Sequence, residues 1–197
     1  MTRQVVIVPT GVANIASVRA AWRRLGADPV LADDPAAVET ASHVMLPGVG
    51  AFGPAMRALA DKGLDRALQR RIEADRPTIC ICVGHQLLFK SSEESPGIRG
   101  LAVIDAHVGR FSDEVRVPQF GWNRVEAEPD CTLLQDGYAY FANSYRALAA
   151  PGCSVALAEH DGLFVAGLEM GNLLSCQFHP ELSGTYGQEL LARFLER

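Results

Sequence analysis

A cysteine at a predicted strand-to-helix junction is the side chain of this sequence with the clearest chemical potential. Residues 78–82 form a short apolar run typical of a buried strand, and a helix is predicted from His85. On such a turn Cys82 lies at a helix N-terminus, which stabilises a thiolate, and the Val83 N–H can reach a developing oxyanion. The pattern therefore predicts a nucleophile. The alternative is a buried structural cysteine, the interpretation that we favour for Cys80.

A cysteine nucleophile needs a base, and of the five histidines His179 lies in the most suggestive context. It stands in the segment Gln177-Phe178-His179-Pro180-Glu181. Because Pro180 favours an extended predecessor, and residues two apart in an extended chain share a side, the Glu181 carboxylate can approach the imidazole. Taken alone, the motif also fits a surface turn. Together with Cys82 it indicates a nucleophile, a base and an orienting carboxylate.

The glycine-rich segment Pro47-Gly48-Val49-Gly50 follows another predicted strand, residues 43–46. The carboxyl ends of parallel strands lie at one edge of a sheet, so this loop is expected beside Cys82. Its glycines allow the backbone N–H groups of residues 48–50 to approach an oxyanion together with that of Val83. A phosphate-binding loop is the alternative, but the Gly-Lys-Ser/Thr ending of a Walker-type loop is missing.

These motifs together resemble those of the class I, or triad, glutamine amidotransferases. Further segments resemble the family in the same order along the chain: Pro47-Gly48-Val49-Gly50-Ala51-Phe52-Gly53, Gln86-Leu87-Leu88-Phe89, Ser92-Glu93-Glu94-Ser95, Pro118-Gln119-Phe120-Gly121-Trp122-Asn123 and Tyr140-Phe141-Ala142-Asn143-Ser144-Tyr145. Three positions depart from the family pattern. Cys80 stands where Gly is usual, Asn143 where His is common, and Leu182 where Lys or Arg is usual.

The resemblance implies a flavodoxin-like fold and hydrolysis of L-glutamine to glutamate and ammonia, without a cofactor or metal. Cys82 would attack the carboxamide and form a γ-glutamyl thioester, with His179 moving protons and Glu181 orienting it. Val83 and the loop of residues 48–50 would hold the oxyanion. The residues that match positions binding the amino-acid end of the substrate are Gln86, Glu94, Ser144 and Tyr145. Solvated polar surface is the alternative for these four side chains.

The resemblance is strongest to family members that supply ammonia to a separate cyclase in histidine biosynthesis. That cyclase is a (β/α)8 barrel, which typically takes about 250 residues, so a chain of 197 residues is expected to form a heterodimer with it. The residues that could dock this partner are Asn14, Pro118, Phe120 and Trp122. An exposed Trp122 would be a binding hot spot, whereas a buried one would belong to the core.

The composition argues against several other classes of protein. The chain has 18 Lys and Arg against 23 Asp and Glu, a net charge of −5 that does not favour nucleic-acid binding. With 48% hydrophobic and 21% charged residues it is not expected to be disordered. No apolar run approaches the roughly 20 residues of a membrane span, and no signal peptide is expected. Five cysteines in such a chain favour free thiols and a cytoplasmic location.

The elements that must position these residues change character midway along the chain. In the first half, predicted strands (4–8, 29–32, 43–46, 78–82) alternate with predicted helices (from Asn14, from Asp34, 54–74 with a break at Gly63, and one that starts with residues 85–89). The second half favours short strands (101–104, 123–126, 138–141, 155–159, 163–168, 173–177) and a final amphipathic helix. Residues 1–197 are thus expected to form one α/β domain. It has a mostly parallel sheet covered on both faces, with mixed or antiparallel strands added.

Three other functions are open at this stage. The first is a glutaminase that serves another amidotransferase, against which the segments 47–53 and 121–123 argue. The second is a thiol hydrolase or redox-stress protein without a partner, but Gln86 and Glu181 favour the amidotransferase. The third is a catalytically silent interaction protein, against which the intact triad argues.

Overall fold

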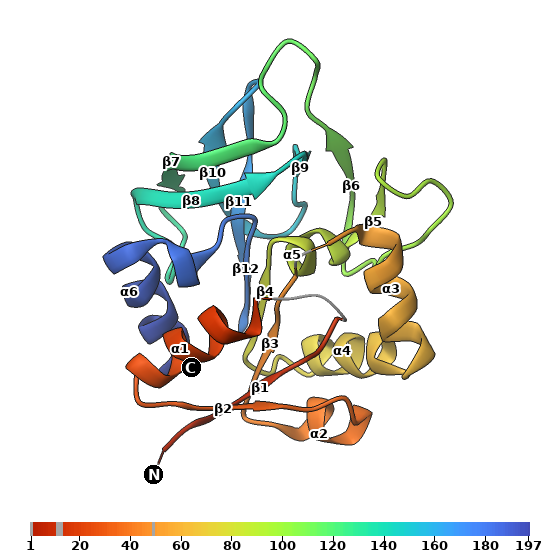
Figure 1. Cartoon of the computed structure of the whole chain (residues 1–197), viewed down its shortest axis with the longest axis vertical. Coiled ribbons are helices and arrows are strands. Elements are labelled where there is room, and N and C mark those ends of the chain that lie inside the picture. Colours follow the sequence, from red (N-terminus) through yellow and green to blue (C-terminus); the bar gives the residue numbers. More distant parts are fainter. Residues whose placement is uncertain (1, 11–13, 49) are drawn as a thin grey trace.

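The computed structural model describes residues 2–10, 14–48 and 50–197. Within these ranges one sheet has nine strands in the order β2-β1-β3-β4-β12-β11-β10-β7-β8 (Figure 1). The parallel half contains β1 (Gln4–Ile7), β2 (Asp28–Leu31), β3 (His43–Leu46), β4 (Thr78–Ile81) and β12 (Leu173–Cys176). The antiparallel half contains β7 (Gln119–Ala127), β8 (Gly137–Asn143), β10 (Ser154–Glu159) and β11 (Leu163–Met170).

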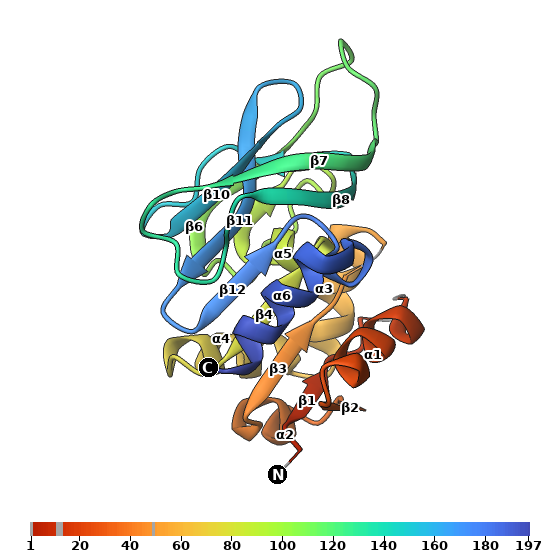
Figure 2. The same cartoon turned by 90° about the vertical axis from the view of Figure 1, so that its left-hand side faces the viewer.

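Helices cover both faces of the parallel half because its strands alternate apolar side chains between the two faces. Val5 and Ile7 point to the side that holds α1 (Ile15–Arg24) and α6 (Gly184–Leu195). Val6 and Val8 point to the other side. That side holds α2 (Pro35–Thr40), α3 (Phe52–Asp61), α4 (Leu64–Glu73) and α5 (Val83–Leu87). Figure 2 shows α1 and α6 lying in front of the parallel strands, with β7, β8 and β10 above them.

A small second sheet lies beside α5 and differs from the sequence expectation. It consists of β5 (Phe89–Ser92), β6 (Ile104–Arg110) and β9 (Tyr145–Ala147). The helix expected to start at His85 is present as α5, but it covers only Val83–Leu87, and the chain then enters β5. The predicted strand over 101–104 is wrong, since β6 begins only at Ile104. These strands are short and polar, and their pairing with distant partners rather than a local pattern creates them.

The other predicted elements agree with the structure within a few residues. Asn14 caps α1 and Asp34 caps α2 through side-chain hydrogen bonds to backbone N–H groups. Gly63 separates α3 from α4, and Asp161-Gly162 lies at the turn of the β10–β11 hairpin. The α/β architecture with a parallel half and added antiparallel strands is confirmed. None of the described helices has the length and hydropathy of a membrane span.

Candidate active site

The turn at Cys82 has the strained geometry expected of a nucleophile that faces a cavity. Strand β4 ends at Ile81 and helix α5 begins at Val83, so Cys82 alone makes the turn. Its backbone has φ 53° and ψ −107°, a conformation that residues other than glycine rarely adopt. Such strain costs on the order of 1–3 kcal/mol and persists only where surrounding contacts impose it. The Cys82 N–H donates to the Cys176 carbonyl at 2.8 Å, which ties the turn to strand β12.

The loop after strand β3 packs directly on this turn, and glycine makes the approach possible. A Cβ added at Gly48 would lie 2.6 Å from the Cβ of Val83, and one added at Gly84 would lie 3.2 Å from Leu46 Cγ. The added Cβ would also clash with backbone atoms, Gly84 N in the first case and the Leu46 carbonyl oxygen in the second, so neither position accepts a larger residue without displacement of the backbone. Gly50 has φ +104° and lines the cavity next to Cys82. Val49, the remaining oxyanion candidate, lies outside the described residues.

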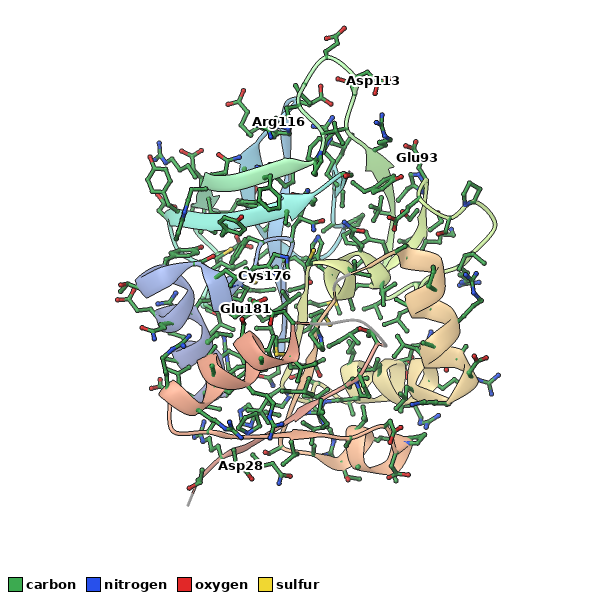
Figure 3. All side chains as sticks on the ribbon, in the orientation of Figure 1. Asp28, Glu93, Asp113, Arg116, Cys176 and Glu181 are labelled. Atoms are coloured by element: carbon green, nitrogen blue, oxygen red, sulfur yellow. The ribbon has the colours of Figure 1, made fainter. Side chains whose placement is uncertain are left out.

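His179 and Glu181 form a buried hydrogen-bonded pair beside Cys82. His179 Nδ1 lies 2.8 Å from Glu181 Oε1, and their side chains are only 7% and 5% exposed. Figure 3 shows Glu181 inside the molecule close to Cys176, where its second oxygen, Oε2, is buried without a hydrogen-bond partner among the described residues. Burial by itself lowers the pKa of His179. Hydrogen bonds to Cys82 and Glu181 and the negative charge of both outweigh burial and raise that pKa to about 10.

One cavity of about 310 Å³ collects most of the predicted site residues. It is lined by Gly50, Cys82, Val83, Gln86, Glu94, Ala142, Asn143, Ser144, Tyr145 and His179. The structure therefore brings the cysteine, the histidine and all four predicted substrate-binding residues to one space. The volume lies at the lower end of the range for ligand sites, which suits a molecule of the size of an amino acid.

Gln177 contacts the cysteine sulfur, and the sequence analysis did not single it out. Its amide Nε2 lies 3.8 Å from Cys82 Sγ, and its Oε1 accepts a hydrogen bond of 2.9 Å from Gln86 Nε2. The same Gln86 nitrogen also donates to the Tyr145 carbonyl at 3.3 Å. Both hydrogens of the Gln86 amide are thus engaged, so its Oε1 is the atom available to a ligand. A sequence signal existed, because Gln177 precedes His179 by two residues and shares its side of the extended chain.

Glu94 connects the cavity with the start of helix α3. One carboxylate oxygen accepts from the Phe52 N–H at 2.6 Å, and Ser95 Oγ accepts from the Gly53 N–H at 3.0 Å. A carboxylate at a helix N-terminus pairs with free N–H groups and with the positive end of the helix dipole. These contacts hold the chain that follows Gly50 against the segment that carries Glu94. The second oxygen of Glu94 remains for a ligand in the cavity.

The three departures from the family pattern lie in different environments. Cys80 is fully buried in β4, and burial raises the pKa of its thiol far above the usual range, so it stays protonated and unreactive. Asn143 lines the cavity and donates to the Tyr145 carbonyl at 3.0 Å. Leu182 is 41% exposed. In the described part of the chain, no group of three or more His, Cys, Asp or Glu residues could hold a metal ion.

The residues predicted to dock a partner fall into two groups. Phe120 and Trp122 project from β7 with 67% and 59% of their surface exposed, and Pro118 is exposed just before this strand. The ring of Tyr140 on β8 packs against both aromatic rings, with centroids at 5.7 and 6.1 Å. We call Phe120, Trp122 and Tyr140 the aromatic face. Asn14 belongs to another element, α1, where its side chain accepts from the Ser17 N–H.

Replacing Glu181 by glutamine should reduce the pH dependence of folding stability. In the folded protein the raised pKa keeps His179 protonated well above pH 6.5, whereas the unfolded chain releases this proton near that pH. The charged imidazole therefore contributes stability that is fully present below about pH 6.5 and is lost as pH rises toward 10. Glu181→Gln removes one of the charges that favour the proton. Each unit by which it lowers the pKa of His179 corresponds to about 1.4 kcal/mol.

The measurement is the free energy of unfolding in urea at pH 6.5 and pH 9 for both proteins. A control variant is Glu93→Gln, which changes the surface pair of Glu93 with His107, 3.9 Å apart and half exposed. Figure 3 shows Glu93 at the periphery, far from Glu181. We expect Glu93→Gln to keep the wild-type loss of stability with pH. Equal pH dependence in wild type and Glu181→Gln would contradict the interpretation of His179.

Comparisons with known proteins agree with this arrangement. The family model described as glutamine amidotransferase class-I matches residues 14–197. The imidazole glycerol phosphate synthase subunit HisH of Symbiobacterium thermophilum is 40% identical over 196 residues, which cover 97% of this chain and 92% of that protein. The chloroplastic imidazole glycerol phosphate synthase hisHF of Arabidopsis thaliana is also 40% identical, over 97% of this chain but 34% of that longer protein.

Solved structures show the same fold. A crystal structure of a glutamine amidotransferase superposes with a TM-score of 0.78 at 23% identity and covers 97% of both chains. This likeness concerns the fold alone, whereas the family model and the relatives at 40% identity concern the sequence along nearly its whole length. The chain therefore belongs to the class I glutamine amidotransferase family, where its relatives include HisH subunits of imidazole glycerol phosphate synthase.

Proposed function

We propose that this chain is the glutaminase subunit of an imidazole glycerol phosphate synthase in histidine biosynthesis. It hydrolyses L-glutamine and passes the ammonia to a separate (β/α)8-barrel cyclase, which forms imidazole glycerol phosphate and aminoimidazole carboxamide ribotide. One observation carries the proposal. A single cavity of about 310 Å³ holds Cys82 on its strained turn, His179 with its carboxylate partner, and four polar side chains suited to an amino acid.

In the proposed reaction the Cys82 sulfur attacks the carboxamide carbon of glutamine, while His179, whose raised pKa keeps it protonated, already holds the proton that the thiol has given up. The Val83 N–H and a donor from the loop of residues 48–50 hold the negative oxygen of the tetrahedral intermediate, each such donor contributing about 3–4 kcal/mol. His179 returns the proton to the leaving nitrogen, so ammonia departs and a γ-glutamyl thioester remains. Water, deprotonated by the same base, then releases glutamate and the free thiol. Glu181 keeps the imidazole oriented, and Gln177 donates toward the sulfur.

The amino-acid end of glutamine is held by groups with complementary charge or hydrogen-bonding capacity. The free oxygen of Glu94 and Oε1 of Gln86 are acceptors for the α-ammonium group. Ser144 and Tyr145 line the same cavity and supply polar groups for the α-carboxylate. This division explains why the cavity needs both a carboxylate and neutral donors.

The aromatic face is the proposed docking surface for the cyclase. Exposed aromatic side chains are enriched in binding hot spots, and a cluster of them on one strand pair is uncommon on a free surface. We further propose that Pro118 and Asn14 border this interface and that residues 1–197 form one domain. The length of the Arabidopsis relative supports the need for a second domain, because this chain covers only 34% of it. Five free thiols fit a reducing compartment such as the cytoplasm.

Isotope transfer tests the proposed function. The chain is mixed with a (β/α)8-barrel cyclase subunit of the histidine pathway, its phosphoribosyl substrate and glutamine labelled with ¹⁵N in the side-chain amide. We expect the label in imidazole glycerol phosphate and one glutamate per product. Glutamine consumption without label transfer would favour a glutaminase of another amidotransferase. No glutamine consumption, with or without the cyclase, would refute the glutaminase assignment itself.

Trp122→Ala should weaken the complex with the cyclase. A central interface tryptophan contributes about 2 kcal/mol or more, which corresponds to a dissociation constant about 30-fold higher. Titration calorimetry measures this constant directly. The matched control is Leu31→Ala, because Leu31 is also half exposed but lies on β2, at the other end of the sheet order from β8. If both substitutions raise the dissociation constant equally, or if neither raises it, docking at the aromatic face is contradicted.

A further inference from the structure

The hydroxyl of Ser183 joins the main chain of the proposed base to strand β8. Ser183 is only 1% exposed and lies between the 3-10 helix Pro180–Leu182 and helix α6. Its Oγ accepts a hydrogen bond of 2.9 Å from the Tyr140 N–H and donates one of 2.6 Å to the His179 carbonyl. The His179 N–H in turn donates to the Tyr140 carbonyl at 2.9 Å. The His179 N–H is thus bound to Tyr140 directly, and the His179 carbonyl is connected to Tyr140 through the Ser183 hydroxyl.

The direction of these hydrogen bonds follows from the atoms involved. A serine hydroxyl has one proton, and the Tyr140 N–H can only donate, so the proton of Ser183 goes to the His179 carbonyl. Removing the hydroxyl would leave the buried Tyr140 N–H without a partner, and the His179 carbonyl would keep only the Leu182 N–H, which donates to it at 3.0 Å. The loss would fall on the main chain that carries the imidazole rather than on the imidazole itself.

The hydroxyl of Ser183 has no role in capping the helix that follows it. Ser183 occupies the N-cap position of α6, where a serine side chain commonly accepts from an N–H of the first turn. Here no such side-chain hydrogen bond forms. The side chain is directed away from the helix, toward Tyr140 and His179. A structural cap therefore does not account for a buried hydroxyl at this position.

Tyr140 connects the same unit to the aromatic face. Its backbone holds His179 and Ser183, while its ring packs against Phe120 and Trp122. Among the described residues, strand β8 is the last strand of the sheet, so no further strand pairs with its outer edge. At that edge the backbone of Tyr140 bonds instead to His179 and Ser183. A molecule bound on the aromatic face would thus contact the residue to which the base is attached.

We propose that Ser183 is a positioning residue, whose hydroxyl sets His179 at the correct distance from Cys82 by fixing its backbone to Tyr140. The inference rests on the proposed glutaminase function. Without the hydroxyl the imidazole keeps its partner Glu181, but the backbone that carries both gains freedom. A displacement of the base by about 1 Å can reduce the rate about 100-fold, so even a partial displacement is measurable. The glutamine-binding side chains belong to other segments and keep their positions.

The test is steady-state glutamine hydrolysis by Ser183→Ala, in the isolated chain and in the complex with the cyclase. We expect kcat to fall about tenfold or more with KM for glutamine unchanged, and Ser183→Thr, which retains a hydroxyl, to recover most of kcat. The control for a lost buried hydroxyl is Thr78→Val. Thr78 Oγ1 also accepts one hydrogen bond and donates another, to Arg76, but at the far end of β4 from Cys82. The Thr78→Val variant should have a lower melting temperature than wild type and the wild-type kcat at temperatures below its unfolding transition.

The outcomes separate this inference from the function on which it rests. If wild type hydrolyses no glutamine in either form, the proposed function fails and the role of Ser183 fails with it. If wild type is active and Ser183→Ala keeps the wild-type kcat, only the positioning role is overturned. If Thr78→Val lowers kcat as much as Ser183→Ala does, the positioning role is also overturned, because the effect would then reflect a general loss of stability.

Discussion

Cys82→Ala should abolish glutamine hydrolysis while the assembled synthase still uses free ammonium. In the proposed reaction the Cys82 sulfur forms the covalent intermediate, and the described residues that line the cavity include no second thiol. Cys80 is buried in the strand and stays protonated. Loss of a nucleophile from an acyl-transfer triad reduces kcat by about 10⁶-fold in the comparable serine case, and we expect at least about 1000-fold here. Glutamate release from glutamine and product formation from ammonium chloride measure the two activities separately.

The backbone conformation at Cys82 provides a second readout. Alanine keeps a side chain at φ 53° and so keeps the strain, whereas Cys82→Gly relieves it. We expect Cys82→Gly to be inactive but about 1 kcal/mol more stable than Cys82→Ala in urea unfolding. Cys153→Ala, at a partly exposed thiol away from the cavity, serves as the matched control and should retain activity. Glutamine turnover by either Cys82 variant near the wild-type rate would exclude the assigned nucleophile.

Arg71→Met should destabilise the fold more than any substitution at the surface. Arg71 on α4 is completely buried and donates to Thr78 Oγ1, while its other partners are the backbone carbonyls of Val38, Glu39, Ala41, Ser42 and Pro77. Burial lowers the pKa of its guanidinium to about 10, which still leaves it charged at neutral pH. Methionine fills similar volume but cannot donate to these acceptors. The Pro77 carbonyl keeps the Val44 N–H as a donor, whereas each acceptor left unpaired where water cannot reach it costs about 1–3 kcal/mol.

We expect Arg71→Met to lower the free energy of unfolding by at least about 3 kcal/mol, a large part of the stability of a typical domain. The neighbouring Arg70→Met is the matched control. Arg70 pairs with Glu39 at 2.8 Å on the surface, with both side chains more than a third exposed, so solvent screens the pair and its loss should change the free energy of unfolding little. Urea midpoints compare the two variants. A change of similar size in both would show that the buried hydrogen bonds of Arg71 add little.

The sequence predicted best what depends on neighbouring residues. The turn at Cys82 follows from an apolar strand that meets a helix start, and the approach of Glu181 to His179 follows from the extended chain that Pro180 imposes. The parallel order of the first strands follows from alternating helices and strands. Short polar strands such as β5 were missed because their residues show no period, and the pairing that forms them involves residues far along the chain.

Only the tertiary structure decided how distant segments meet at the site. Gln177 reaches Cys82 across 95 positions of sequence, and the chain from Asn143 to Tyr145 closes a cavity that begins at Gly50. The sequence around Ser183 and Arg71 likewise gives no sign of their roles. Only the fold brings their side-chain donors to buried backbone carbonyls. The physical reason is that local geometry depends on the conformational preferences of adjacent residues, whereas long-range hydrogen bonds depend on strand register and packing. A single sequence specifies register and packing only through the whole fold.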